Sequence, residues 1–271
     1  MKSWIKAHSL IAFYLLAFAI SWLGWGAQAA YARGWLFPFD SFLFTILGSA
    51  GPTIAAVIVL MLTEGKNSPR DLFQSLFQRA GVGWLLLALL TPLVLVLIAW
   101  ALEPLLGGPQ LAFATLPWSA MLRFLPITLL SNVWEELGWR GYALPRLQQR
   151  YSALGTSVLM GLLWSLWHLP LMLNPDASMA SLPLWAEPVF AVSLTIIYTW
   201  LYNHTAGSLL YVSLFHAASN AVAFALLDVH PDFTRHYVLM VGVTAVVAVA
   251  LVVIFGPARL KRSVREAKPA P

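Results

Sequence analysis

Long apolar runs alternate with short polar segments along the whole chain. Eight of these runs approach the roughly 20 residues that a helix needs to cross a bilayer. They cover about residues 8–30, 41–63, 83–102, 118–144, 154–173, 188–203, 207–227 and 237–257. Because a lone strand cannot satisfy its backbone hydrogen bonds in lipid, all eight are predicted to be helices. The pattern predicts an all-α, polytopic transmembrane helical bundle of about eight spans, in which residues 1–271 form a single integral-membrane domain.

Composition strengthens this prediction. The 271 residues are 60% hydrophobic and only 10% charged, with a mean hydropathy of +0.76, whereas soluble domains carry about 25% charged residues. The absence of cysteine excludes disulfides, thiolate metal sites and a cysteine nucleophile. The net charge of +5 does not indicate a nucleic-acid partner, because the basic residues lie at the chain ends and in short segments between apolar runs.

The basic residues also predict an orientation. With a cytoplasmic N-terminus and alternating spans, 13 of the 16 Lys and Arg residues fall on the cytoplasmic side. The remaining three are Arg33, Arg123 and Arg235. Since cytoplasmic segments are enriched in basic residues, both termini are predicted to be cytoplasmic and the segment 174–187 external.

The first apolar run has a second interpretation. Lys2 and Lys6 precede it, and small residues at 27–30 resemble a signal-peptide cleavage site. Its apolar core is long for a signal sequence, which favours an uncleaved first span.

Ionisable residues interrupt the apolar runs at three places, and such residues are costly at membrane depth. The first place holds Glu135 and Glu136. Neighbours on a helix point about 100° apart, so the two carboxylates serve different partners. Glu136 and Arg140 are four residues apart and are predicted to pair, which leaves Glu135 facing the bundle interior. The alternative is that both acids mark the cytoplasmic end of a helix.

The other two places hold histidines. His168 follows Trp164 by four residues, so that the two rings share a helix face, and Pro170 predicts a kink just beyond them. His216 and Asn220 share a face in the same way. For each histidine the alternative is a hydrogen-bonded core residue or an interhelical hydrogen bond.

The depths of these groups favour one common site. If the fourth run is helical to Leu144, where Pro145 would stop it, Glu135 lies about 13 Å from the helix end. The same reasoning places His216 at about 13 Å, and Asn220 and His168 at about 20 Å. A carboxylate, two imidazoles and an amide at similar depth can activate a water molecule.

These residues resemble three motifs of the CAAX-protease and bacteriocin-processing family, which includes Rce1-type prenyl-protein endopeptidases and bacterial Abi proteins. The motifs are E-E-x-x-x-R, aromatic-x-x-x-H and H-x-x-x-N, found here in order within a core of about residues 118–225. Trp164 departs from the phenylalanine usual in the second motif, which is expected to alter pocket shape rather than chemistry.

The resemblance implies an intramembrane endopeptidase of a bacterial inner membrane. In the family pattern Glu135 and His168 activate water, and His216 and Asn220 stabilise the oxyanion or join a metal site. Glu136, Arg140 and Trp164 would be supporting residues. A catalytic zinc held by Glu135, His168 and His216 is one of the alternatives, because one Glu and two His form a known ligand set.

The partner implied is a membrane-associated peptide or protein. Prenylated C-terminal peptides, bacteriocin leaders and other membrane peptides all remain possible substrates. Two further classes use the same residues: a transporter with a Glu/His proton relay and a non-catalytic scaffold or immunity protein. A transporter is disfavoured by the lack of an internal repeat in the sequence. A non-catalytic protein is disfavoured because the Glu, His, His and Asn set is intact.

Overall fold

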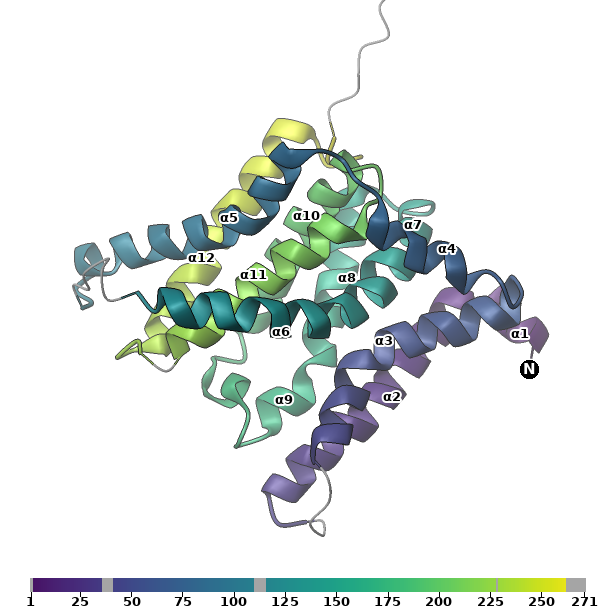
Figure 1. Ribbon diagram of the computed structural model, residues 1–271, viewed down its shortest axis with the longest axis horizontal. Coiled ribbons are helices and arrows are strands. Elements are labelled where there is room, and N and C mark those ends of the chain that lie inside the picture. Colours follow the sequence, from purple (N-terminus) through teal and green to yellow (C-terminus); the bar gives the residue numbers. More distant parts are fainter. Residues whose placement is uncertain (1, 36–40, 110–115, 228, 262–271) are drawn as a thin grey trace, which may run out of the picture.

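The computed structural model describes residues 2–35, 41–109, 116–227 and 229–261, and the fold over these ranges is all-α (Figure 1). The longer helices are α2 (Ser9–Ala32), α3 (Ser41–Thr63), α5 (Val82–Leu102), α6 (Trp118–Glu136), α8 (Ala153–Trp167), α10 (Ala186–His204), α11 (Leu209–Leu227) and α12 (Phe233–Phe255). The short helical elements are α1 (Lys2–Ala7), α4 (Pro69–Gln74), η1 (Ser75–Phe77), η2 (Pro104–Leu106), η4 (Leu137–Ala143), α7 (Leu144–Gln148), α9 (Leu169–Leu173) and η5 (Ser178–Ser181).

Each of the eight apolar runs contains one of the longer helices. Within the described residues, six helical stretches are long and apolar enough to cross a membrane: α2, α3, α5, α8 with α9, α11 and α12. The two that fall short, α6 and α10, carry ionisable residues within them, including Glu135, Glu136 and Glu187. The chain is therefore a multi-pass membrane protein, and its two least apolar long helices carry the buried Glu135, Glu136 and Glu187.

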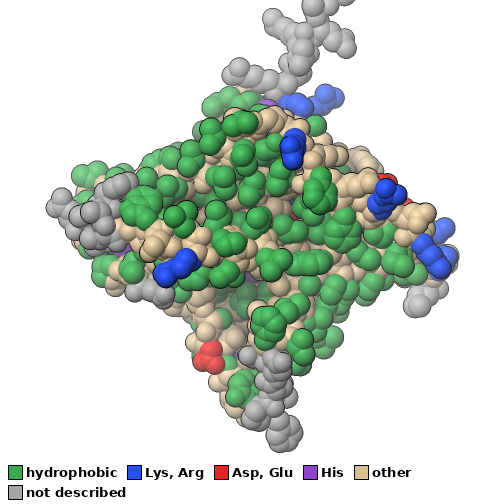
Figure 2. Space-filling view, viewed as in Figure 1, with side chains coloured by type: hydrophobic (Ala, Val, Ile, Leu, Met, Phe, Trp, Pro, Cys, Tyr) green, Lys and Arg blue, Asp and Glu red, His purple; other side chains and the backbone are tan. Residues whose placement is uncertain are grey.

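The helices pack around α6 and α11, which contact each other extensively. Helices α2 and α3 form a hairpin against α6, and α10 packs on α8 and α12 (Figure 1). Helix α5 closes the far side against α11 and α12. Figure 2 shows hydrophobic side chains over most of the displayed face, with Lys and Arg residues few and scattered, as expected for a surface in contact with lipid.

The helical path that follows α6 differs from the prediction. Pro145 does not stop it: α6 leads into η4, a π-helical segment, and then into α7, where Pro145 occupies the first turn. Proline is tolerated there because no earlier carbonyl needs its missing N–H. A π-helical turn shifts the side-chain register and is frequent at functional sites, and here it follows directly after Glu136.

A tight contact fixes this junction against α3. A Cβ atom on Gly138 would overlap the backbone of Pro52, so only glycine allows the two segments to approach this closely. Thr53 donates a hydrogen bond to the carbonyl of Trp134 at the same contact. The end of α6 is thereby anchored just where its two glutamates lie.

The kink predicted at Pro170 is confirmed as a break between α8 and α9. His168 caps α8, and Pro170 lies in the first turn of α9. The Leu171 amide bonds to the carbonyl of His168 rather than that of Trp167. The freed Trp167 carbonyl accepts a hydrogen bond from the indole of Trp22 at 3.1 Å. The break therefore leaves His168 at a helix end, inside the bundle.

The C-terminal basic tail was predicted to be cytoplasmic. The structure describes it only to Lys261, so Arg262, Arg265 and Lys268 lie outside the described residues.

Candidate active site

A buried ion pair joins the end of α6 to η4. Glu136 Oε1 lies 2.9 Å from Arg140 Nη1, and neither side chain is exposed. The pair predicted from the four-residue spacing is thus confirmed. Because a buried charge is costly without its partner, each of these residues depends on the other.

Arg140 is enclosed by three further side chains. Its guanidinium carbon lies 4.6 Å from the ring centroid of Trp164 and 4.6 Å from that of Tyr198. Its Nη2 atom donates a hydrogen bond to Thr195 Oγ1 at 3.2 Å. Aromatic faces attract a cation, so Arg140 is fixed in place by α8 and α10 as well as by Glu136.

His216 shares the carboxylate oxygen that binds Arg140. Its Nδ1 atom lies 2.9 Å from Glu136 Oε1, in a fully buried environment. An ionised carboxylate only accepts hydrogen bonds, so Nδ1 carries the proton and Nε2 is left for other partners. The sequence grouped His216 with Asn220 on α11 and did not anticipate this contact with Glu136.

His168 has a carboxylate partner of its own. Its Nδ1 atom lies 3.2 Å from Glu187 Oε1, and the Tyr237 hydroxyl donates to Glu187 Oε2 at 2.8 Å. Glu187 is buried in the first turn of α10, where the helix dipole favours an acid. Sequence reasoning missed Glu187 and Tyr237 and assigned Glu187 to an external loop. The sequence feature that could have identified Glu187 is an acid next to Pro188 at the start of a predicted helix.

The ring of Trp164 separates the two imidazoles. Its centroid lies 5.3 Å from that of His168 and 5.4 Å from that of His216. The two histidines, predicted to share one site, therefore lie on the same indole. Trp164 is buried, which agrees with its predicted role as an apolar wall.

Glu135 differs from its neighbour in having no bound cation. It is 6% exposed, and its Oε2 atom is buried without a hydrogen-bond partner. His216 and His168 are among the ionisable groups near it. Glu136 Oε2 is likewise buried without a partner, so what distinguishes Glu135 is that it forms no ion pair among the described residues, whereas Glu136 pairs with Arg140.

Asn220 pairs with a second amide. Its Nδ2 atom donates to Asn132 Oδ1 at 3.2 Å, and the Nδ2 atom of Asn132 is itself buried without a partner. Asn132 lies one helical turn before Glu135 on α6 and was missed from the sequence. The two amides bring hydrogen-bond donors to the same end of α6 as the carboxylate.

The fit of these residues to a catalytic zinc is incomplete. The donor types suit zinc, and each imidazole has the carboxylate partner that metal-binding histidines usually have. However, the ligand atoms of Glu135, His168 and His216 do not gather into a group within 4.8 Å of one another in the described part of the chain. We therefore derive no chemical step that involves a metal at this site.

A cavity of about 70 Å³ adjoins the amide side of the site. It lies between α5, α10, α11 and α12, and its lining is mainly apolar. Asn220 and Ser219 contribute polar groups on one side and Tyr237 on another. An apolar group bound here would lie against Asn220 and against the tyrosine that holds Glu187.

Comparison with known proteins agrees with this arrangement. Residues 117–222 match the family described as "Type II CAAX prenyl endopeptidase Rce1-like", a range that holds all three motifs. The chain is also 28% identical over 253 residues to CAAX prenyl protease 2 of Methanococcus maripaludis, covering 89% of this chain and 92% of the relative. Over residues 117–222 the chain is therefore similar to the Rce1-like type II CAAX prenyl endopeptidase family, and over most of its length it is similar to a CAAX prenyl protease.

Proposed function

We propose that the protein is an intramembrane endopeptidase that hydrolyses a peptide bond in a membrane-associated peptide. One observation carries the proposal: Glu135 is buried with one oxygen that has no partner, near two histidines whose Nδ1 atoms are each held by another carboxylate. A base that is poised but unpaired, next to oriented imidazoles, is the arrangement needed to deprotonate water.

In the proposed reaction, Glu135 accepts a proton from water, and His168, held by Glu187, orients that water through its Nε2 atom. The water oxygen bonds to the scissile carbonyl carbon, whose oxygen becomes an oxyanion. Asn220 donates a hydrogen bond to this oxyanion, and His216, held by Glu136, lies beside it and helps to stabilise it. The carbon–nitrogen bond then breaks, and Glu135 returns its proton to the leaving amine.

Glu136, Arg140 and Trp164 act as supporting residues in this proposal. Glu136 holds His216 and is itself held by Arg140. Trp164 spaces the two imidazoles and covers Arg140. They position the reacting groups without contacting substrate.

We assign the substrate class from the name of the Methanococcus relative and from the apolar cavity beside Asn220. A prenylated C-terminal peptide supplies both the scissile bond and an apolar group that such a cavity suits. The protein is proposed to act in the cell membrane, with both termini and most of its basic residues in the cytoplasm.

The test is cleavage by purified protein in lipid nanodiscs. Peptides with the same sequence are offered with a farnesyl group, with a saturated alkyl chain and with no lipid, and products are identified by mass spectrometry. We expect endoproteolytic cleavage of the farnesylated peptide and weak cleavage of the others. Equal cleavage of all three peptides would contradict the prenyl assignment. The protease assignment would be contradicted if none of the peptides were cleaved and if the membrane peptides of cells with the wild type and with Glu135→Ala were the same.

A further inference from the structure

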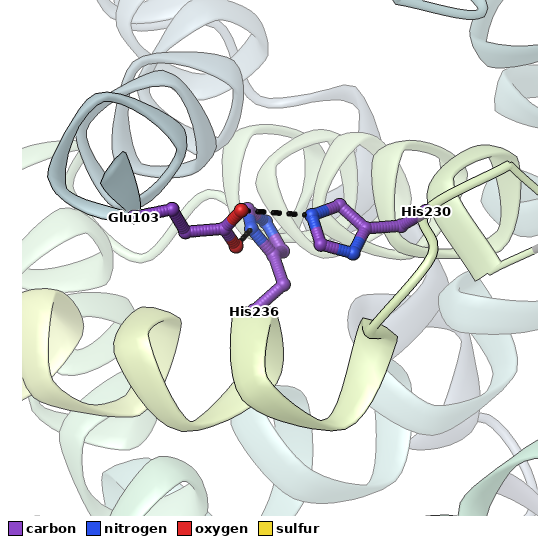
Figure 3. Close-up of side chains that lie close together, drawn as sticks. All are labelled: Glu103, His230 and His236. Carbon is purple, nitrogen blue, oxygen red and sulfur yellow. Dashed lines mark hydrogen bonds and ion pairs between the residues drawn. The ribbon is translucent and has the colours of Figure 1, made fainter. Parts of the chain in front are cut away.

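A second buried cluster lies beyond the cavity that adjoins Asn220, and one of its members, His236, also lines that cavity. Glu103 ends α5, His230 lies in the connection between α11 and α12, and His236 lies in the first turn of α12. Glu103 Oε1 is 2.8 Å from His236 Nδ1, and Glu103 Oε2 is 3.1 Å from His230 Nε2. Figure 3 shows both imidazoles pointing toward the one carboxylate. The sequence analysis did not single out any of these three residues.

Among the described residues Glu103 forms no ion pair with a permanent cation, although Arg235 binds the nearby carbonyl of Leu106. Its side chain is buried, and it lies at the C-terminal end of α5, where the helix dipole disfavours a negative charge. The ion pairs found for Glu103 among the described residues are with the two histidines, and none is with Lys or Arg. A buried carboxylate in this position needs a positive charge close by.

The three ligand atoms have nearly the spacing that a metal requires. They all lie within 4.8 Å of one another, and all three residues are buried. In a tetrahedral zinc site with bonds of 2.0–2.2 Å, neighbouring ligand atoms are about 3.3 Å apart. The observed contacts of 2.8 and 3.1 Å involve the two different oxygens of Glu103, so a metal between them requires the imidazoles to move apart and the carboxylate to turn or to bind through both oxygens.

The imidazole protons also have to be accounted for. Each ligand nitrogen now donates a proton to Glu103 and must lose it to bind a metal. The Nε2 atom of His236 is buried with no partner, so it can take the proton that leaves Nδ1. His230 Nδ1 accepts a hydrogen bond from the Asp232 amide at 3.1 Å. Metal binding at His230 therefore requires that the proton on Nε2 move to Nδ1, which breaks the hydrogen bond from the Asp232 amide.

We propose that Glu103, His230 and His236 form a binding site for a divalent transition metal, with zinc the best match. Two imidazoles and one carboxylate favour zinc over magnesium or calcium, which prefer oxygen ligands. The metal would neutralise Glu103 and clamp the end of α5 to the start of α12. It would be a site separate from Glu135, and it does not depend on the proposed protease mechanism.

The experiment uses chelator-treated, tag-free protein titrated with zinc chloride, with stoichiometry from elemental analysis and affinity from calorimetry. His230→Gln and His236→Asn test the cluster. His168→Gln/His216→Gln tests the candidate active site, and the exposed His8→Gln is the matched control. X-ray absorption at the zinc edge of the wild-type protein reports the ligands without requiring any variant to fold.

We expect about one zinc per wild-type chain, with two imidazole ligands and an increase in melting temperature. Each cluster variant should weaken binding at least about 100-fold, because losing a direct ligand costs more than losing a supporting one. The active-site and control variants should bind as the wild type does. The proposal would be overturned if the wild type bound no zinc. It would also be overturned if both cluster variants kept zinc while the His168→Gln/His216→Gln protein lost it.

Discussion

At the scale of single residues, the two adjacent glutamates have different partners. Glu136 binds Arg140 and His216 through one oxygen, while Glu135 forms no ion pair among the described residues, and each acid keeps one buried oxygen without a partner. The helical spacing of Glu136 and Arg140 was enough to predict their pair from the sequence. The contact of Glu136 with His216 was not predictable in this way, because it joins two helices 80 residues apart in the chain.

Glu136→Gln should destabilise the protein. The substitution leaves Arg140 buried without its counterion, and breaking a buried ion pair costs about 3–5 kcal/mol. Melting curves should show a clear loss, and Glu136→Gln/Arg140→Met should recover part of it because neither charge is then left alone. A Glu136→Gln protein that melts with the wild type would show that the pair is not structural.

Glu187→Gln should lower turnover without unfolding the protein. Glu187 holds His168 in one tautomer and orientation, and losing such a carboxylate should reduce kcat at least about tenfold while KM changes little. Glu187→Asp should recover part of the activity, and the exposed Asp176→Asn is the control. The pH dependence of kcat should move in Glu187→Gln, since the imidazole loses its anionic partner. An unchanged pH profile and kcat would rule out a positioning role.

At the scale of helices, periodicity and length predicted where the helices lie but not how they end. The break at His168 was signalled by Pro170, whereas the π-helical segment after Glu136 had no signal, because an apolar pattern cannot distinguish 3.6 residues per turn from a local widening. The close approach of Gly138 to Pro52 likewise depends on the tertiary packing of α3.

Gly138→Ala should therefore lower both stability and activity. Its new methyl group would overlap the backbone of Pro52 and push away the segment that carries the two glutamates, at about 1–3 kcal/mol. Gly242→Ala, in α12, is the matched control, since a Cβ there meets nothing within 4 Å. Melting temperature and turnover should fall for Gly138→Ala alone. If both variants behave as the wild type, the junction does not fix the site.

At the scale of the whole molecule, the sequence predicted the all-α class and one region in which the polar residues meet. It missed the interactions that join loops to helix ends, such as Glu187 with His168 and Glu103 with His230 and His236. Such contacts have no periodic spacing, because the two sides lie on different elements and meet only in the folded bundle. The orientation in the bilayer stays a prediction from the basic residues.

That orientation can be tested because the chain contains no cysteine. Asn67→Cys and Ser178→Cys place single thiols at exposed positions in two different loops. In right-side-out vesicles, an impermeant maleimide should label Ser178→Cys and should reach Asn67→Cys only after the membrane is opened. The reverse labelling pattern would show that the predicted orientation is inverted.

The most direct test of the central claim is the turnover of Glu135→Gln on a fluorogenic membrane peptide, measured beside a melting curve. The substitution keeps the shape of the side chain and removes the proton acceptor, so turnover should fall at least about 100-fold, with melting close to that of the wild type. Glu135→Gln with near-wild-type turnover, beside an inactive but fully stable Glu136→Gln, would contradict the assignment of Glu135 as the base.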